Sequence, residues 1–162
     1  MTATTGGERE RLARVMDLAL HVRDLGAEIG LPYVAASADI SSPEPMLGPD
    51  GLPLAETTFE WLDAGLRYWR DRSFALRAPF ILAARYAAEP FFYHQGRFAS
   101  WRPLPRLEAI PVAEAAQDFG VAAAVIAPAY LTGGVIGAVV WASDEPLADL
   151  PALYAAHADR LP

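Results

Sequence analysis

The side chains best suited to acid–base or metal chemistry at neutral pH are three histidines, His21, His94 and His157. They fall in three separate predicted elements, and none has a histidine or carboxylate at a spacing typical of metal ligands. His94 follows an aromatic run and could face a pocket, so a small enzyme that uses His94 with a nearby carboxylate stays open. The interpretation we favour for each histidine is a surface or hydrogen-bonded side chain.

Motifs for covalent catalysis and phosphate binding are missing from the sequence. The Gly133-Gly134-x-x-Gly137 segment joins two predicted strands rather than opening a helix, so it is not a phosphate loop. The absence of cysteine excludes disulfides, thiolate catalysis and cysteine-based zinc sites. The G-x-S-x-G context of a nucleophilic serine is lacking at Ser37, Ser73, Ser100 and Ser143. We therefore predict no catalytic residue, no metal site, no cofactor and no enzyme.

Aromatic side chains are better candidates for binding chemistry, because they crowd into the first two-thirds of the chain. Rings with a polar tip can line an apolar pocket and still offer a few directed hydrogen bonds. Any one of them could be plain core, but as a cluster they predict a pocket. The set is Tyr33, Phe59, Trp61, Tyr68, Trp69, Phe80, Tyr86, Phe91, Phe92, Tyr93 and Trp101.

The middle of the chain is locally basic. Eight of the 13 cationic residues, all of them arginines, lie from Arg67 to Arg106, against four acids between Glu60 and Arg106. We favour a solvated helix face with intrachain ion pairs, with a partner contact or an anion site as the alternative. The whole chain has a net charge of −7, which argues against nucleic-acid binding through its overall field.

Apolar spacing and the positions of glycine and proline predict the elements that position these residues. A helix is expected from Glu8 to about Gly26, and a strand from Tyr33 to Ile40. A proline-rich loop follows, with a turn at Pro49-Asp50-Gly51 that is either a hairpin tip or an irregular lid. The later elements are a helix beginning near Phe59 and capped by Thr57 or Thr58, a helix over 74–88, a strand over 91–93, a helix over 112–119 and a final helix over 147–161.

A hairpin is predicted late in the chain. Two apolar runs, Val121 to Ala127 and Val135 to Trp141, flank a turn at Leu131-Thr132-Gly133-Gly134. Gly120 can supply the left-handed residue that ends the preceding helix. Because both runs are continuously apolar, both faces of the hairpin should be covered.

This order of elements predicts an α/β (α+β) fold, an α/β/α sandwich whose central antiparallel sheet has helices on both sides, as in PAS- and GAF-like sensor domains. With 162 residues, one domain is expected, over residues 8–162, after a flexible tail at residues 1–7. The hydrophobic content of 53% favours dense packing, dimerisation or an enclosed apolar ligand. A polar N-terminus and the absence of a run of membrane-spanning length predict a cytoplasmic protein without membrane contact.

The sequence resembles the autoinducer-binding domain of LuxR-type quorum-sensing regulators over about residues 10–150. The C-terminal third carries the best match: Asp118-Phe119-Gly120-Val121, then Pro128, Gly134, Ala142-Ser143 and Pro146. Earlier matches are Glu28-Ile29-Gly30-x-x-Tyr33, the pair Trp61 and Trp69, and Pro79 followed after fourteen residues by Tyr93.

The resemblance implies a sandwich that encloses an acyl-homoserine lactone and usually forms a homodimer. It implies a cavity lined by Tyr33, Trp61, Tyr68, Trp69 and Tyr93. The chain ends at Pro162 without a helix-turn-helix domain, so DNA contact is expected only through such a domain outside this chain.

Three positions depart from the family pattern. Ala78 stands where the family has an aspartate that accepts a hydrogen bond from the ligand amide, and Gly65 stands where it has a tryptophan for the lactone carbonyl. Val140 stands where it has a hydroxyl residue. These departures favour a pocket retuned to a more apolar ligand. The alternative is a ligand-independent dimerisation or anti-activator module that pairs with a full-length regulator.

Overall fold

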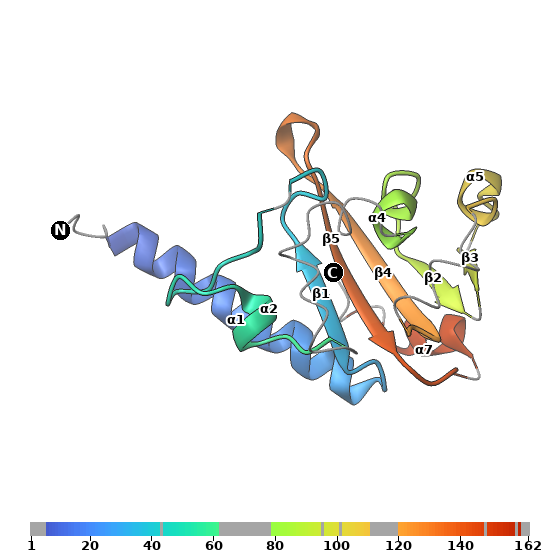
Figure 1. Ribbon diagram of the computed structural model, residues 1–162, viewed down its shortest axis with the longest axis horizontal. Coiled ribbons are helices and arrows are strands. Elements are labelled where there is room, and N and C mark those ends of the chain that lie inside the picture. Colours follow the sequence, from blue (N-terminus) through green and yellow to red (C-terminus); the bar gives the residue numbers. More distant parts are fainter. Residues whose placement is uncertain are drawn as a thin grey trace.

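A five-stranded antiparallel sheet with the strand order β1-β5-β4-β2-β3 forms the centre of the protein (Figure 1). The computed structural model describes residues 6–42, 44–61, 79–94, 96–100, 102–110, 120–147, 149–157 and 159. The strands are β1 (Tyr33–Ser37), β2 (Phe91–His94), β3 (Arg97–Ala99), β4 (Ala123–Tyr130) and β5 (Ile136–Ser143). The predicted antiparallel sheet is confirmed.

The two long strands of the sheet, β4 and β5, form the predicted hairpin. Their register runs without interruption from Ala123 opposite Ser143 to Tyr130 opposite Ile136. Gly133 and Gly134 close the turn with φ angles of 81° and 78°, a region that costs glycine little because it has no Cβ. Strand β1 adds beside β5 and β2 beside β4, so the hairpin is the middle of the sheet.

Helices cover both faces of the sheet, as the apolar runs predict. On one side, called here the α1 face, lie α1 (Gly6–Glu28), α2 (Leu54–Thr57) and α7 (Leu150–His157), which contribute residues such as Leu25, Leu54 and Leu150 to its core. On the other, the α4 face, α4 (Pro79–Ala84) and α5 (Pro105–Glu108) contribute Phe80, Ala83 and Leu107. Alternate residues of each strand serve the two faces, because side chains alternate along a strand.

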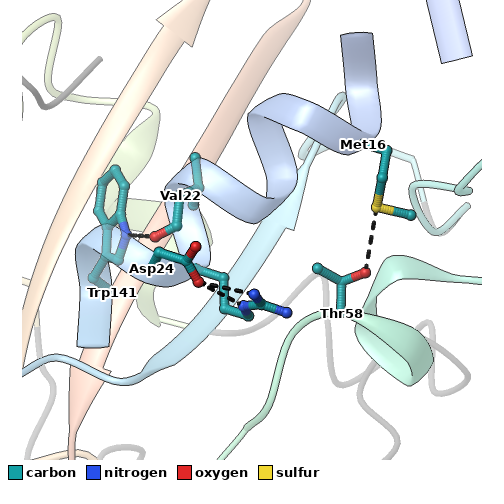
Figure 2. A network of polar contacts seen from close by, with 6 residues as sticks. Met16, Val22, Asp24, Thr58 and Trp141 are labelled. Carbon is teal, nitrogen blue, oxygen red and sulfur yellow. Dashed lines mark hydrogen bonds and ion pairs between the residues drawn. The ribbon is translucent and has the colours of Figure 1, made fainter. Parts of the chain in front are cut away.

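Trp141 is the anchor of helix α1 on the sheet. It is fully buried, and its Nε1 donates a hydrogen bond to the carbonyl oxygen of Val22 at 2.9 Å (Figure 2). Gly26, one helical turn beyond Val22, gives the indole ring the space it needs. Closer to the N-terminus of α1, the sulfur of Met16 lies 3.8 Å from the Oγ1 of Thr58, the residue that ends helix α2 (Figure 2).

Residues 59–61, where a helix was predicted to begin, are not helical, and the rest of that predicted helix lies outside the described residues. Thr58 ends the short helix α2. Pro53, which precedes α2, already has a fixed φ of −58°, and Leu54 buries its side chain, so the helical turn forms earlier. The carbonyl of Glu60 then accepts a hydrogen bond from the Val34 N–H at 2.9 Å, which covers the outer edge of β1.

Other bounds differ by a few residues. Helix α1 already begins at Gly6, so two residues of the expected tail are helical, and β1 ends at Ser37 rather than Ile40. Helix α4 ends at Ala84, and the final helix spans Leu150–His157. The turn at Pro49-Asp50-Gly51 is the tip of a small hairpin, in which Leu47 bridges to Pro53. Strand β3 and helix α5 were not predicted, and the predicted helix over 112–119 lies outside the described residues.

Candidate functional site

Four predicted site residues fall in the described part of the chain, and all four belong to the core of the α4 face. Tyr93 and Val140 are buried in it, and Tyr33 and Trp61 are half-buried against it. The sheet thus brings together residues that are up to 107 positions apart, Tyr33 and Val140, in sequence. The other four predicted residues, Gly65, Tyr68, Trp69 and Ala78, lie outside the described residues.

The strand register places the two tyrosines in one row across the sheet. Tyr33 is opposite Ala142, Ala142 opposite Ala124, and Ala124 opposite Tyr93. Phe98 on β3 ends the row. Since neighbouring strands are 4.7–4.9 Å apart, the backbones at Tyr33 and Tyr93 are separated by about 14 Å. Only methyl groups project from the sheet between them.

Val140 lies in the adjacent row of the α4 face. Its neighbours across the strands are Ala35 on β1 and Ile126 on β4, and Phe91 follows on β2. All four are apolar, so this row offers van der Waals contact and no side-chain hydrogen bond. Together the two rows form a floor of small and branched apolar side chains between a tyrosine on each side.

Tyr93 is held in a cluster of aromatic rings. Its ring centroid is 5.4 Å from that of Phe80 and 5.4 Å from that of Phe98, at interplanar angles of 82° and 62°. Such edge-to-face pairs are favourable, because the positive edge of one ring meets the negative face of another. Phe98 also meets Phe91 and Phe80 edge to face, so four rings fix one another. Burial raises the pKa of the Tyr93 phenol above its ordinary value. A hydrogen bond between this phenol and the backbone of Gly96 lowers the pKa by a smaller amount.

We expect the buried phenol of Tyr93 to make the protein sensitive to alkaline pH. Above about pH 10, the ordinary pKa of tyrosine, the unfolded chain releases this proton while the folded protein still holds it. The contribution of this phenol to the free energy of unfolding is therefore fully present below pH 10. It is lost as the pH rises through the raised pKa of the folded state. The urea midpoint measured between pH 8 and pH 11 checks this.

The matched control for this prediction is Tyr86, an exposed tyrosine in the turn after α4. Tyr93→Phe should flatten the alkaline fall of the urea midpoint, whereas Tyr86→Phe should leave the fall as it is in the unaltered protein. An alkaline fall of the same slope in Tyr93→Phe would contradict the assignment to this phenol.

Trp61 and Tyr33 approach the floor from the β1 edge of the sheet. Trp61 does so from the extended segment after α2 and not from a helix, because Glu60 is tied to β1 by its carbonyl. Tyr33 is the first residue of β1 and follows the buried Leu31 and the exposed Pro32. No hydrogen-bond partner for the Tyr33 hydroxyl occurs among the described residues. This hydroxyl can therefore bond to a ligand without breaking a bond within that part of the chain.

The histidines lie away from this site. His94 follows Tyr93 on β2 and pairs with Ala123, a core residue of the α1 face, so its side chain belongs to the opposite side of the sheet. Its buried Nε2 has no hydrogen-bond partner in the described ranges. His21 is exposed on α1, and His157 is half-buried in α7. Within the described residues, no three His, Asp or Glu side chains gather as a metal site.

The described arginines of the basic middle are exposed and do not form the expected ion pairs. Arg85, Arg97, Arg102 and Arg106 make no ion pair with another described residue. Arg85 instead contacts Ser41 Oγ at 3.5 Å. The remaining four arginines of this region lie outside the described residues.

Phe98, Trp141 and Tyr130 are described aromatic residues that the predicted set lacks. Phe98 was missed because β3 is only three residues long, although Gly96, with a φ of 84°, is a turn signal between two aromatic stretches. Trp141 lies on the α1 face and closes the core there, so it is a structural residue. None of the helices formed by the described residues has the length and apolar character to cross a membrane.

Comparison with protein families supports the assignment that the fold and the aromatic row suggest. The model described as the autoinducer binding domain matches residues 15–161. Searches of curated proteins and of solved structures each found no match. Because the family match runs over almost the whole chain and covers both faces of the sheet, the chain belongs to the autoinducer-binding domain family, the sensory domain of LuxR-type quorum-sensing regulators.

Proposed function

We propose that the chain binds an apolar or amphipathic signal, an acyl-homoserine lactone or a non-standard relative, on the α4 face of the sheet. The family is sensory and not enzymatic, which directs attention to binding. The observation that carries the proposal is the row in which Tyr33 and Tyr93 flank Ala142 and Ala124. An acyl chain or an aryl group can lie along methyl groups, while a phenol at each side offers a hydrogen bond.

In this proposal the described residues have distinct roles. Tyr33 supplies a hydroxyl, and Trp61 covers the ligand with its ring from the β1 edge. Tyr93, whose ring is held by Phe80 and Phe98, bounds the ligand on the β2 side of the row. Val140 supplies apolar contact. We also propose Gly65, Tyr68, Trp69 and Ala78 as ligand contacts, from the family resemblance of their positions.

The apolar surroundings of Val140 favour a ligand with fewer polar contacts than an ordinary acyl-homoserine lactone. Ala35, Ile126 and Phe91 complete its row, and none of them replaces the hydroxyl expected at this position. A buried ligand group without its partner costs about 1–3 kcal/mol, which is about 5- to 150-fold in affinity. We therefore expect long-chain or aryl ligands to bind more tightly than short-chain lactones.

The test is a thermal unfolding series with acyl lactones of increasing chain length, aryl lactones and fatty amides. A ligand that binds only the folded protein stabilises it by about 2.7 kcal/mol when present at 100 times its Kd. At least one apolar member should raise Tm, and short-chain lactones should raise it less. No rise with any member of the panel would contradict ligand binding.

A pair of conservative variants assigns the effect to the α4 face. Tyr33→Phe should reduce the ligand-induced rise in Tm while the ligand-free Tm changes little, because the hydroxyl has no partner among the described residues. Tyr86→Phe, at an exposed position in the turn after α4, should leave the rise unchanged. Equal rises in both variants would contradict a role for Tyr33.

We further propose that the chain pairs with a second copy, and that DNA contact requires a helix-turn-helix domain outside this sequence. Pairing is favoured by four exposed apolar side chains at one end of the sheet, Leu82, Tyr86, Tyr130 and Leu131. The alternative proposal is a ligand-independent module that pairs with a full-length regulator. Sedimentation of the chain alone and thermal unfolding with and without ligand separate the two proposals. Only the sensor should pair with itself in sedimentation and also show a higher Tm with ligand.

A further inference from the structure

One end of the sheet exposes an unusual group of large apolar side chains. Leu82 and Tyr86 project outward from α4 and the turn that follows it. Tyr130 ends strand β4, and Leu131 follows it directly. The exposed fractions of these four side chains are 42%, 51%, 53% and 51%. The other large apolar side chains exposed in the described part of the chain are Leu18, Leu47 and Leu52, which lie on α1 and the small hairpin. We call the first four residues the apolar tip.

The apolar tip is held in place from both sides. The Tyr130 hydroxyl donates a hydrogen bond to the carbonyl oxygen of Ala87 at 2.9 Å, which ties β4 to the turn after α4. Beneath it, Ala84 of α4 packs with Ile40 and Ala138 in a small buried cluster. Figure 1 shows α4 at the end of the sheet from which the β4–β5 turn extends. A surface that is already ordered loses little conformational entropy on binding.

The charge around the apolar tip differs from that of the whole chain. Residues 79–94 and 123–136 contain one arginine, Arg85, and one acid, Glu89, so these two segments have a formal charge of zero. Asp39, next to Ile40 and Ser41, adds one acid beside them, whereas the chain carries −7. The side chains of Arg85 and Glu89 are exposed and flank Tyr86 in sequence. Two copies of an acidic chain repel each other least where each presents a nearly neutral face.

We propose that the apolar tip is the surface through which two copies of this chain associate. A two-fold axis brings the same patch of both subunits together, so the patch must complement itself. The apolar side chains of one subunit then pack on those of the other, and Arg85 faces Glu89 of the partner subunit. The proposal specifies where the pairing proposed above occurs and is independent of ligand binding.

Sedimentation of the full chain over a concentration series tests the apolar part. Leu82→Asp and Tyr86→Asp should each raise the dimer dissociation constant about tenfold or more, since buried aromatic and aliphatic anchors dominate interfaces. Leu52→Asp is the control, because Leu52 is 50% exposed and lies away from the tip. An equal effect of all three variants, or no effect of the first two, would overturn the proposal.

Charge reversal tests the two-fold arrangement without altering the apolar residues. Arg85→Glu and Glu89→Arg should each weaken the dimer, because like charges then face each other, and the double variant should restore it. Additive weakening in the double variant would overturn the arrangement. A monomeric unaltered chain would overturn self-association altogether, while the ligand-induced rise in Tm would still report the sensing function separately.

Discussion

Replacing Gly26 with alanine should destabilise the protein by about 3 kcal/mol, the upper end of what overpacking a core costs. A Cβ at Gly26 would lie 2.6 Å from the Leu31 carbonyl oxygen and 2.7 Å from Cδ1 of Trp141. The first of these is backbone, and the second belongs to a fully buried ring, so neither can move aside easily. Helix α1 would have to lift from the sheet. Urea denaturation measures the loss.

The same helix provides the control. Gly7→Ala adds the same methyl group where nothing lies within 4 Å of the new Cβ. It should leave stability unchanged or raise it by up to about 1 kcal/mol, the helix propensity difference between alanine and glycine. Equal stability of the two variants would show that α1 is not packed on the sheet as described.

Replacing Trp141 with alanine should cost about 3–5 kcal/mol, the usual range for a large aromatic residue removed from a core. Trp141 is completely buried on the α1 face, and it also supplies the hydrogen bond to Val22 at 2.9 Å. Trp141→Phe keeps most of the ring but loses that donor, so it should cost less, about 1–3 kcal/mol. Urea midpoints of both variants measure this order, and a larger loss in Trp141→Phe would contradict it.

The effects of Gly26→Ala and Trp141→Ala on stability should also be coupled. Removing the indole relieves the clash between Cδ1 and an alanine at position 26, but the clash with the Leu31 carbonyl remains. The double variant should therefore lose less stability than the sum of the two single variants, as residues in contact do. Strict additivity in this cycle would mean that Gly26 and Trp141 do not meet.

Several features could be predicted from local sequence because their signals are local. The β4–β5 hairpin follows from two apolar runs and the glycines between them, and β2 follows from an aromatic run. Continuous apolar character also predicts that both faces are covered. The family could be inferred as well, since the residues that support the resemblance lie mainly in the hairpin and its flanks.

The errors occur where long-range contacts compete with local propensity. Thr57 and Thr58 look like helix caps, yet they lie at the end of α2, because a buried Leu54 and a proline begin that helix earlier. The next residues pair with β1 through the Glu60 carbonyl, 26 positions away from Val34. Neither contact can be seen from the residues that make up the predicted helix.

The sequence alone determines the strands of the hairpin, the alternation that buries both of its faces and the set of aromatic candidates. Only the tertiary structure decides which candidates share a face, because this depends on register between strands distant in sequence. A shift of one residue in β2 would move Tyr93 to the α1 face and bring His94 to the α4 face. Register is set by packing of the whole core, so it joins Tyr33 to Tyr93 in one row and leaves His94 on the other side.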